Sequence, residues 1–204
     1  MKFALGEKIG MSQMFDAQGR VVPVTLVRVT ANTVVGIMTP EKHGYTAVQV
    51  GTGTRRERLI AKPQRGQFGD LGFFRHVREF RVPKIEAQRG DTIGVEAFQE
   101  GDSVKVSGLS KAKGFQGVVK RHGFHGAPKT HGTKHAHREP GSIGGGGGRA
   151  GGRVAKGIRM AGRMGGGQVT VLNLRIAKID AEHQVLAIQG AVPGRRGTLL
   201  EVRG

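Results

Sequence analysis

Residues 109–168 read LSKAKGFQGVVKRHGFHGAPKTHGTKHAHREPGSIGGGGGRAGGRVAKGIRMAGRMGGGQ, and their composition differs from that of the rest of the chain. They hold 12 Lys and Arg against one acid, Glu139, and 18 of the chain's 36 glycines. Only ten of their side chains are apolar and larger than alanine, which is too few to offset the entropy of ordering 60 residues. We therefore expect this extension to be disordered alone and ordered by a partner outside the chain.

The charge of the extension indicates what that partner is. Of the formal net charge of +18 in 204 residues, +11 lies in the extension and +7 in the flanking 144 residues. A concentrated positive charge points to a polyanion, either nucleic acid or an acidic membrane surface. Dense glycine lets a backbone approach phosphates closely and present its N–H groups to them. Nucleic acid is therefore the favoured partner.

Candidate RNA contacts are the cations and histidines of the extension, two glycines of its densest run, and a second basic cluster nearer the N-terminus. The candidates in the extension are Lys111, Lys113, Lys120, Arg121, His122, Lys129, His131, Lys134, His135, His137, Arg138, Gly145, Gly146, Arg149, Arg153, Lys156, Arg159 and Arg163. The second cluster comprises Arg55, Arg56, Arg58 and Lys62. It lies in residues 54–78, which show no regular periodicity. Phe68, Phe73 and Phe74 of that region either stack on RNA bases or pack against the protein.

The flanking sequence has the texture of short strands separated by glycine-containing turns. Strands are expected over residues 20–29, 45–50, 79–82, 92–95, 103–107, 169–179, 184–189 and 198–202. Pro23 suggests an edge or a bulge in the first of them. Alternation in the sixth places Thr170, Leu172, Leu174 and Ile176 on one face.

The predicted fold is therefore mainly β. It is a small β-barrel built discontinuously from residues 1–108 and 169–204, with residues 109–168 as a long, irregular, basic, glycine-rich inserted extension. Because loop entropy grows only logarithmically with length, a stable barrel tolerates such an insertion. Within the extension, Phe115, Val118, Val119 and His122 have helical spacing and predict a short helix over residues 113–122, which the nearby glycines weaken.

Other chemistries find little support in the sequence. The run GGGRAG at residues 146–151 formally matches a dinucleotide fingerprint, but it follows no strand and no acid lies about twenty residues further on. The histidines of the extension lack cysteines or clustered carboxylates to complete a metal site, and contact with nucleotides explains them better. No nucleophile, base and acid stand out as a set. We expect no catalysis, no cofactor, no metal and no small-molecule substrate.

The cellular setting follows from absences in the sequence. The chain has no cysteine, so neither disulfides nor thiol chemistry is expected. Lys2, Glu7 and Lys8 interrupt the N-terminus too early for a secretory signal. No run approaches the 18 or so apolar residues of a membrane span. An intracellular, reducing environment is the expectation.

Six motifs spread along the chain carry a resemblance to a known family. They are GEKIGM (6–11), VSGLSKAKGFQGVVKR (106–121), THG (130–132), HREPGSIG (137–144), MAGRMG (160–165) and GAVPG (190–194). The chain resembles the bacterial large-subunit ribosomal protein L-three family. The resemblance implies a β-barrel on the subunit surface and an extension that runs through ribosomal RNA toward the peptidyl-transferase region. Gly145 departs from the family pattern, because many bacterial relatives carry a methylated glutamine at that point.

The expected function is that of a structural constituent of the large ribosomal subunit in the cytoplasm. It binds large-subunit ribosomal RNA, supports subunit assembly and buttresses the peptidyl-transferase region. The resemblance also implies contacts with neighbouring large-subunit ribosomal proteins, and no membrane contact is expected. The alternative is a polycation that binds anionic membranes, but the extension lacks an amphipathic helix with a wide apolar face.

Residues 140–148, PGSIGGGGG, carry no charge, so we predict that they pack closely against RNA rather than neutralise it. Gly146→Val, which alters no charge, should therefore slow growth and reduce assembled large subunits more than Lys129→Ala, which removes one. Growth rates and subunit profiles of strains that depend on each variant provide the measurement. A normal Gly146→Val strain beside an impaired Lys129→Ala strain would show that charge dominates instead.

Overall fold

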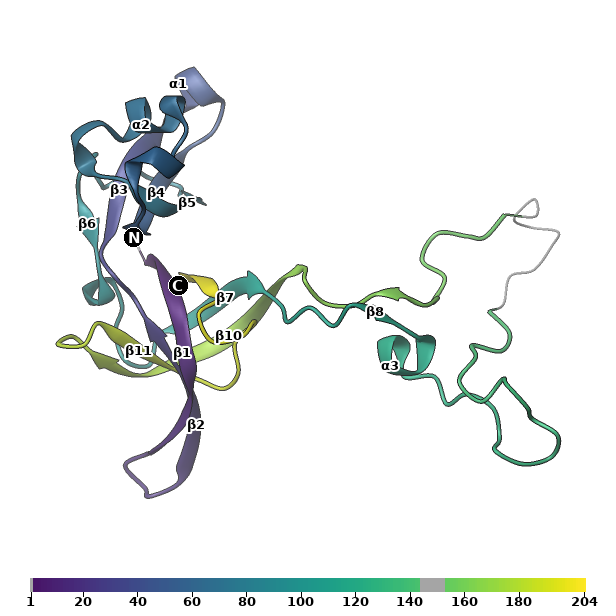
Figure 1. Ribbon diagram of the computed structural model, residues 1–204. Helices are drawn as coiled ribbons and strands as arrows, with labels where there is room; N and C mark the ends of the chain where they lie inside the picture. The colour runs from purple at the N-terminus through teal and green to yellow at the C-terminus, as the bar shows by residue number, and fades with distance from the viewer. Residues whose placement is uncertain (1, 144–152) are drawn as a thin grey trace. The chain divides into compact units, whose positions relative to one another are not determined.

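The computed structural model describes residues 2–143 and 153–204, and its strands form three sheets (Figure 1). The strands are β1 (Phe3–Phe15), β2 (Val21–Arg28), β3 (Asn32–Met38), β4 (Ala47–Thr54), β5 (Phe74–Arg81), β6 (Thr92–Ile93), β7 (Ser103–Leu109), β8 (Phe115–Gln116), β9 (Gly162–Arg163), β10 (Gln168–Asp180), β11 (Val185–Gln189) and β12 (Leu199–Arg203). The helices are α1 (Pro40–His43), α2 (Lys62–Phe68) and α3 (Val118–His122), with 3-10 turns η1 (Glu57–Leu59), η2 (Gly69–Leu71) and η3 (Val95–Ala97). The prediction of a mainly β fold is confirmed. None of the helices in these two described ranges is long and apolar enough to cross a bilayer.

Six strands close into an antiparallel barrel in the order β1-β12-β7-β10-β11-β2. Three of these strands precede the extension in sequence and three follow it. The barrel interior is apolar, and Val27, Val106, Leu186, Ile188 and Val202 are among its buried side chains. The predicted small barrel is therefore present.

The extension joins two strands that are neighbours in the barrel. Leu109, at the end of β7, pairs with Gln168, at the start of β10, so the two ends of the insertion meet. Residues 1–110 and 168–204 form one compact unit, and residues 111–167 form a second. Because the entropy cost of closing a loop grows only logarithmically with its length, a long insertion at this position adds little to that cost.

The predicted alternation along β10 is wrong at two of its four positions, because Thr170 is exposed and lies beside Ser107 on the outer face of the barrel. Leu174 and Ile176 face the barrel core, but Leu172 has 62% of its surface exposed. The register with β7 shifts between Val171 and Leu174, and Asn173 adopts a left-handed φ of 56°. A bulge of this kind inserts residues into one strand only, and it reverses the face on which each subsequent side chain lies.

A second sheet, which the sequence did not separate from the barrel, has the strand order β5-β4-β3-β6. Its apolar core contains Val34, Val48, Val50 and Phe80 together with Phe3 from the barrel. The rings of Phe3 and Phe80 stack with centroids 4.3 Å apart. The expectation that all flanking strands belong to one barrel is therefore too simple. Strands β3 to β6 form their own layer against one side of β1.

Strand β1 is buried on both faces at its N-terminal end because it belongs to both cores. Ala4 faces the barrel interior, whereas Phe3 and Leu5 face the second sheet. The buried Asn32, at the start of β3, accepts a hydrogen bond from the Leu5 N–H at 2.9 Å. Its amide nitrogen donates to the Leu5 carbonyl at 3.1 Å. The Asn32 side chain thus replaces the β2 backbone, whose pairing with β1 begins only at Glu7.

The expectation that Pro23 lies at the edge of a sheet is met, although the barrel itself is closed. Pro23 pairs with Gln13 of β1, but the pairing of β2 with β11 extends only from Val24 to Arg28. Pro23 therefore lies one residue beyond the point where β2 has partners on both sides. A residue without an N–H is tolerated there because no ladder bond requires that donor.

Replacing residues 112–165 with a short Gly-Ser linker should leave a folded, cooperative barrel, because the apolar cores draw on residues outside that range. Among the residues that the structure describes, Val118 is the one buried hydrophobic side chain that the change removes. Urea unfolding followed by circular dichroism checks this, with the full chain as control. A variant that is unfolded in buffer would show that the extension belongs to the core.

Candidate nucleic-acid interface

The base of the extension consists of two hydrogen-bonded arms. Strand β8 pairs with β9, with Phe115 opposite Arg163 and Gln116 opposite Gly162. The pairing continues on one side, because the Lys113 N–H donates to the Met164 carbonyl and the Met164 N–H donates to the Gly114 carbonyl, both at 2.9 Å. The expectation that the whole extension is disordered alone does not describe this base. Hydrogen bonds between the two backbone segments order the base, although it lacks an apolar core.

Helix α3 follows β8 and is shorter than the predicted segment of residues 113–122. It begins at Val118, whose side chain is buried, and it ends at His122. Gly123 takes a left-handed φ of 75°, and its N–H caps the Val119 carbonyl at 3.0 Å. The last turn carries Lys120, Arg121 and His122, which complement the negative end of the helix dipole. Phe115 lies outside the helix.

Two of the candidate RNA contacts hold the arms together. Arg121 Nη1 donates to the Met160 carbonyl at 2.6 Å, and His122 Nε2 lies 3.0 Å from the same oxygen. A carbonyl only accepts, so His122 carries a proton on Nε2. Arg121 and His122 are partly buried, and both help to fix α3 against the returning arm.

A loop over residues 126–137 extends from this base. It is closed by a hydrogen bond from the Ala127 N–H to the His137 carbonyl at 3.1 Å. His137 Nδ1 is buried and has no hydrogen-bond partner among the described atoms, whereas His131 and His135 are exposed. Within the described residues, no group of three His, Cys, Asp or Glu side chains is placed to hold a metal ion.

The cations of the extension are electrostatically unbalanced. The structure describes eleven of them, ten are exposed, and Arg121 is partly buried. None of the eleven forms an ion pair with a described carboxylate. By contrast, the barrel pairs Lys2 with Asp102 at 2.8 Å and Arg203 with Glu201 at 3.1 Å. Unpaired cations on an exposed ribbon produce a positive field that an external polyanion can neutralise.

The comparisons with known proteins agree with the family that the motifs suggested. A family model described as Ribosomal protein L3 matches residues 79–185. A protein named large ribosomal subunit protein uL3 from Mycobacterium tuberculosis is 51% identical over 208 residues, covering 99% of this chain and 95% of the relative. Proteins of the same name from Nocardia farcinica and Synechococcus are 48% and 47% identical, each covering 98% of this chain and at least 90% of the relative. The chain belongs to the ribosomal protein L3 family.

In this L3-family chain, most of the predicted RNA contacts of the extension lie on its surface. Those that the structure shows as exposed are Lys111, Lys113, Lys120, Lys129, His131, Lys134, His135, Arg138, Arg153, Lys156, Arg159 and Arg163. Arg121, His122 and His137 are partly buried. Gly145, Gly146 and Arg149 lie outside the described residues. The assignment of all these residues to RNA stays a prediction.

The second basic cluster surrounds η1 and the start of α2. Arg55, Arg56, Arg58 and Lys62 are all exposed, and none of them pairs with a described carboxylate, because Glu57 beside them is bonded to Arg65 at 3.1 Å. These four cations therefore remain available to a partner, although they lie in a different compact unit from the extension.

The structure decides between the two alternatives for the phenylalanines of residues 54–78. Phe68 is 2% exposed and joins Val35 and Ile60 in a small core, against which Phe73 and Phe74 pack. These rings pack against the protein, so stacking on RNA is wrong for Phe68, which has no free face. The helix α2 that carries Phe68 was missed because its seven residues include Pro63 and Gly66.

A cationic cavity that the sequence did not suggest lies beside the barrel outer face. It has a volume of about 350 Å³, and its lining includes His76, Arg78, Arg195 and Glu201. Burial, with repulsion from Arg75 and Arg78, lowers the pKa of His76, so its imidazole is neutral at pH 7. Its lining residues come from four separate segments of the chain, so no local sequence signal marks the cavity.

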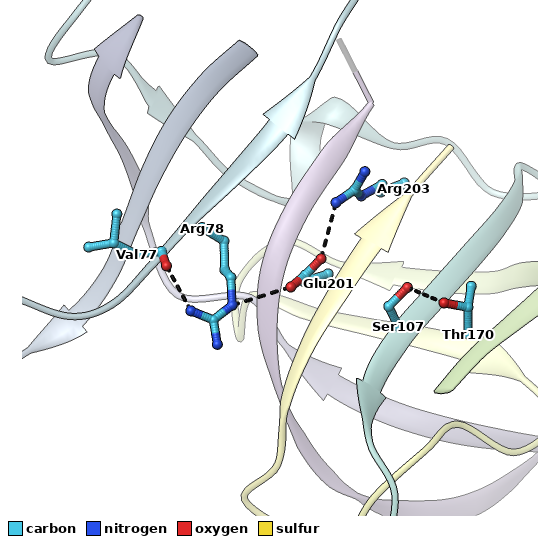
Figure 2. Close-up of polar contacts among 6 residues, drawn as sticks. All are labelled: Val77, Arg78, Ser107, Thr170, Glu201 and Arg203. Atoms are coloured by element: carbon cyan, nitrogen blue, oxygen red, sulfur yellow. Dashed lines mark hydrogen bonds and ion pairs between the residues drawn. The ribbon is translucent and has the colours of Figure 1, made fainter. Parts of the chain in front are cut away.

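The arginines around this cavity are only partly available to a ligand. Figure 2 shows Glu201 between Arg78 and Arg203, with N–O distances of 3.3 Å and 3.1 Å. The Ser107 and Thr170 hydroxyls, 2.7 Å apart, join β7 to β10 on the same face of the barrel. Glu201 therefore offsets much of the local positive charge, whereas the described cations of the extension form no ion pair with a described carboxylate.

Gly165→Ala should separate the two arms, because an added Cβ would lie 2.0 Å from the Lys111 carbonyl oxygen. Gly157→Ala is the matched control, since both glycines have a left-handed φ but a Cβ at Gly157 meets nothing within 4 Å. Hydrogen exchange at the Lys113 and Met164 amides should accelerate only in Gly165→Ala. Equal exchange in the two variants would mean that these arms do not depend on the close approach at Gly165.

Proposed function

We propose that this chain is a structural constituent of the large ribosomal subunit that binds large-subunit ribosomal RNA through its extension. One observation carries the proposal: ten exposed cations without carboxylate partners lie on the extension of a chain that belongs to the L3 family. A protein of this kind works in the ribosomes of the cytoplasm. It has no catalysis, cofactor or small-molecule substrate of its own.

Binding of the extension to RNA is favoured by counterion release. Each phosphate that meets a lysine or arginine frees condensed counterions, and the gain in entropy grows with the number of contacts. Cations already paired with carboxylates would contribute little, because the existing pair must first be broken. The unpaired cations of the extension do not incur that cost, which is why the proposal assigns RNA binding mainly to residues 111–167.

The role in assembly is assigned from two features of the extension. Its base is structurally ordered, and the segment beyond the base needs a partner to become ordered. The paired arms and α3 fix where the extension begins its path, while the cations and glycines beyond them let its backbone approach RNA closely. By binding several RNA segments at once, such a ribbon lowers the repulsion between them and supports subunit assembly. We infer that the tip lies near the peptidyl-transferase region, as the resemblance to the family implies, and that the extension buttresses that region.

Contacts with neighbouring ribosomal proteins are best assigned to the β1–β2 hairpin. Phe15 and Val21 face each other across its end and are 68% and 55% exposed. The only charges near the turn, Asp16 and Arg20, pair with each other at 3.0 Å. An apolar surface with balanced charge suits a protein partner better than a phosphate backbone.

A membrane-binding polycation remains the alternative function, and the structure gives it less support. Membrane-surface helices are long enough to bury a wide apolar face at the interface. Helix α3 has five residues, and the one buried among them is Val118. The cations of the described extension are therefore not accompanied by an apolar face that would insert into lipid.

The affinity of the full chain for an in vitro transcript of bacterial large-subunit ribosomal RNA should fall steeply with salt. Ten phosphate contacts correspond to a slope of log affinity against log salt of about −7 to −9. Filter binding over a range of salt concentrations measures the slope, and the variant lacking residues 112–165 is the control. A slope no steeper than that expected for two or three contacts would contradict the proposal.

A further inference from the structure

Phe115 has an environment that neither the fold nor the charge of the extension explains. Its side chain is 77% exposed although it belongs to the paired base of the extension, where the backbone is ordered on both sides. Helical spacing with Val118 predicts that Phe115 belongs to a short helix, but α3 begins three residues later and buries Val118 alone. Nothing described in the structure covers the ring, so it is free to meet a partner.

The residue paired with Phe115 is Arg163, which carries a guanidinium group. Arg163 is directly opposite Phe115 in the β8–β9 ladder, so the two side chains project from the same face of the ladder. Arg163 is exposed and forms no ion pair with a described carboxylate. The extension contains one acid, Glu139, so little negative charge competes for this guanidinium.

We propose that Phe115 and Arg163 form a binding site for one unpaired nucleotide of RNA. The base stacks on the face of the Phe115 ring, and the guanidinium of Arg163 contacts the adjoining phosphate. A base within a duplex has both faces covered by its neighbours, so the site selects unpaired nucleotides. The inference rests on the proposed RNA-binding function and specifies one ligand of that same extension.

The backbone around the site is arranged to hold both side chains before RNA arrives. The ladder is extended by the bonds between Lys113, Gly114 and Met164, and the contacts of Arg121 and His122 with Met160 close the following turn. A site held in this way loses less conformational entropy on binding than a free chain does. The neighbours of Phe115 along its arm are Gly114 and Gln116, so no apolar residue adjoins the ring in the sequence.

The test compares the full chain with ring variants on two RNA probes. The probes are a 12-nucleotide oligoadenylate, which offers unpaired bases, and an RNA hairpin with the same number of phosphates, whose bases are all paired and whose two strands are joined by a non-nucleotide linker. Phe115→Ala should weaken oligoadenylate binding about tenfold, because stacking on an aromatic ring contributes about 1–3 kcal/mol per base. The same change should alter hairpin binding less than twofold.

Three further variants separate stacking from other effects. Phe115→Tyr keeps the ring and should bind within about twofold of the unaltered chain, whereas Phe115→Leu keeps apolar bulk without a ring and should weaken binding as alanine does. Phe15→Ala is the matched control, because that ring is 68% exposed but faces Val21 rather than an arginine. It should leave both affinities unchanged. Arg163→Ala should reduce the salt slope by about one.

Each result bears on a different claim. If the unaltered chain binds neither RNA, the proposed RNA-binding function itself fails. If it binds both but Phe115→Ala or Phe115→Leu binds oligoadenylate normally, RNA binding stands and the stacking site is wrong. Equal loss on both probes in Phe115→Ala would also overturn the site, because the ring would then act through the structure of the arms.

Discussion

The architecture depends on the pair of hydrogen bonds between the Asn32 side chain and the backbone of Leu5. At Leu5, strand β1 has lost β2 as a neighbour, and an unpaired N–H and carbonyl in the buried interior would be costly. The Asn32 amide satisfies both groups and also donates to the Thr30 carbonyl at 2.7 Å. The chain can therefore leave the barrel after β2 and start a second sheet that packs against the opposite face of β1.

The barrel that results is a support with a lower density of positive charge than the extension, since the flanking 144 residues carry +7 and the extension carries +11. Some barrel cations are paired with carboxylates, as Lys2 is with Asp102 and Arg203 with Glu201. The extension begins between β7 and β10, where adjacent strands hold its ends together through the pairing of Leu109 with Gln168. The fold thus separates two tasks, because stability resides in the apolar cores while unpaired positive charge is concentrated in residues 111–167.

Within the extension, hydrogen bonds order the chain, whereas an apolar core does so in the rest of the protein. The Met160 carbonyl is bound by both Arg121 and His122, and short backbone pairing joins β8 to β9. Such contacts order a base without burying much apolar surface, and they leave the remaining cations exposed. Some cations of a basic segment therefore organise the segment itself, while others remain for a partner. Sequence composition alone does not distinguish these two groups.

The sequence by itself determined the β class, the concentration of charge in residues 109–168, the position of the insertion and most strands after it, because these depend on local composition and periodicity. It did not reveal the long β1 or β3, since β1 is buried on both faces at its N-terminal end and lacks a regular alternation. It also misplaced Thr170 and Leu172, whose face depends on a bulge, and it assigned Phe115 to a helix although this residue lies in a two-residue ladder. Only the tertiary structure decided these features and the separate sheet around Asn32. Each of them depends on which strand, distant in the sequence, forms hydrogen bonds with the segment in question.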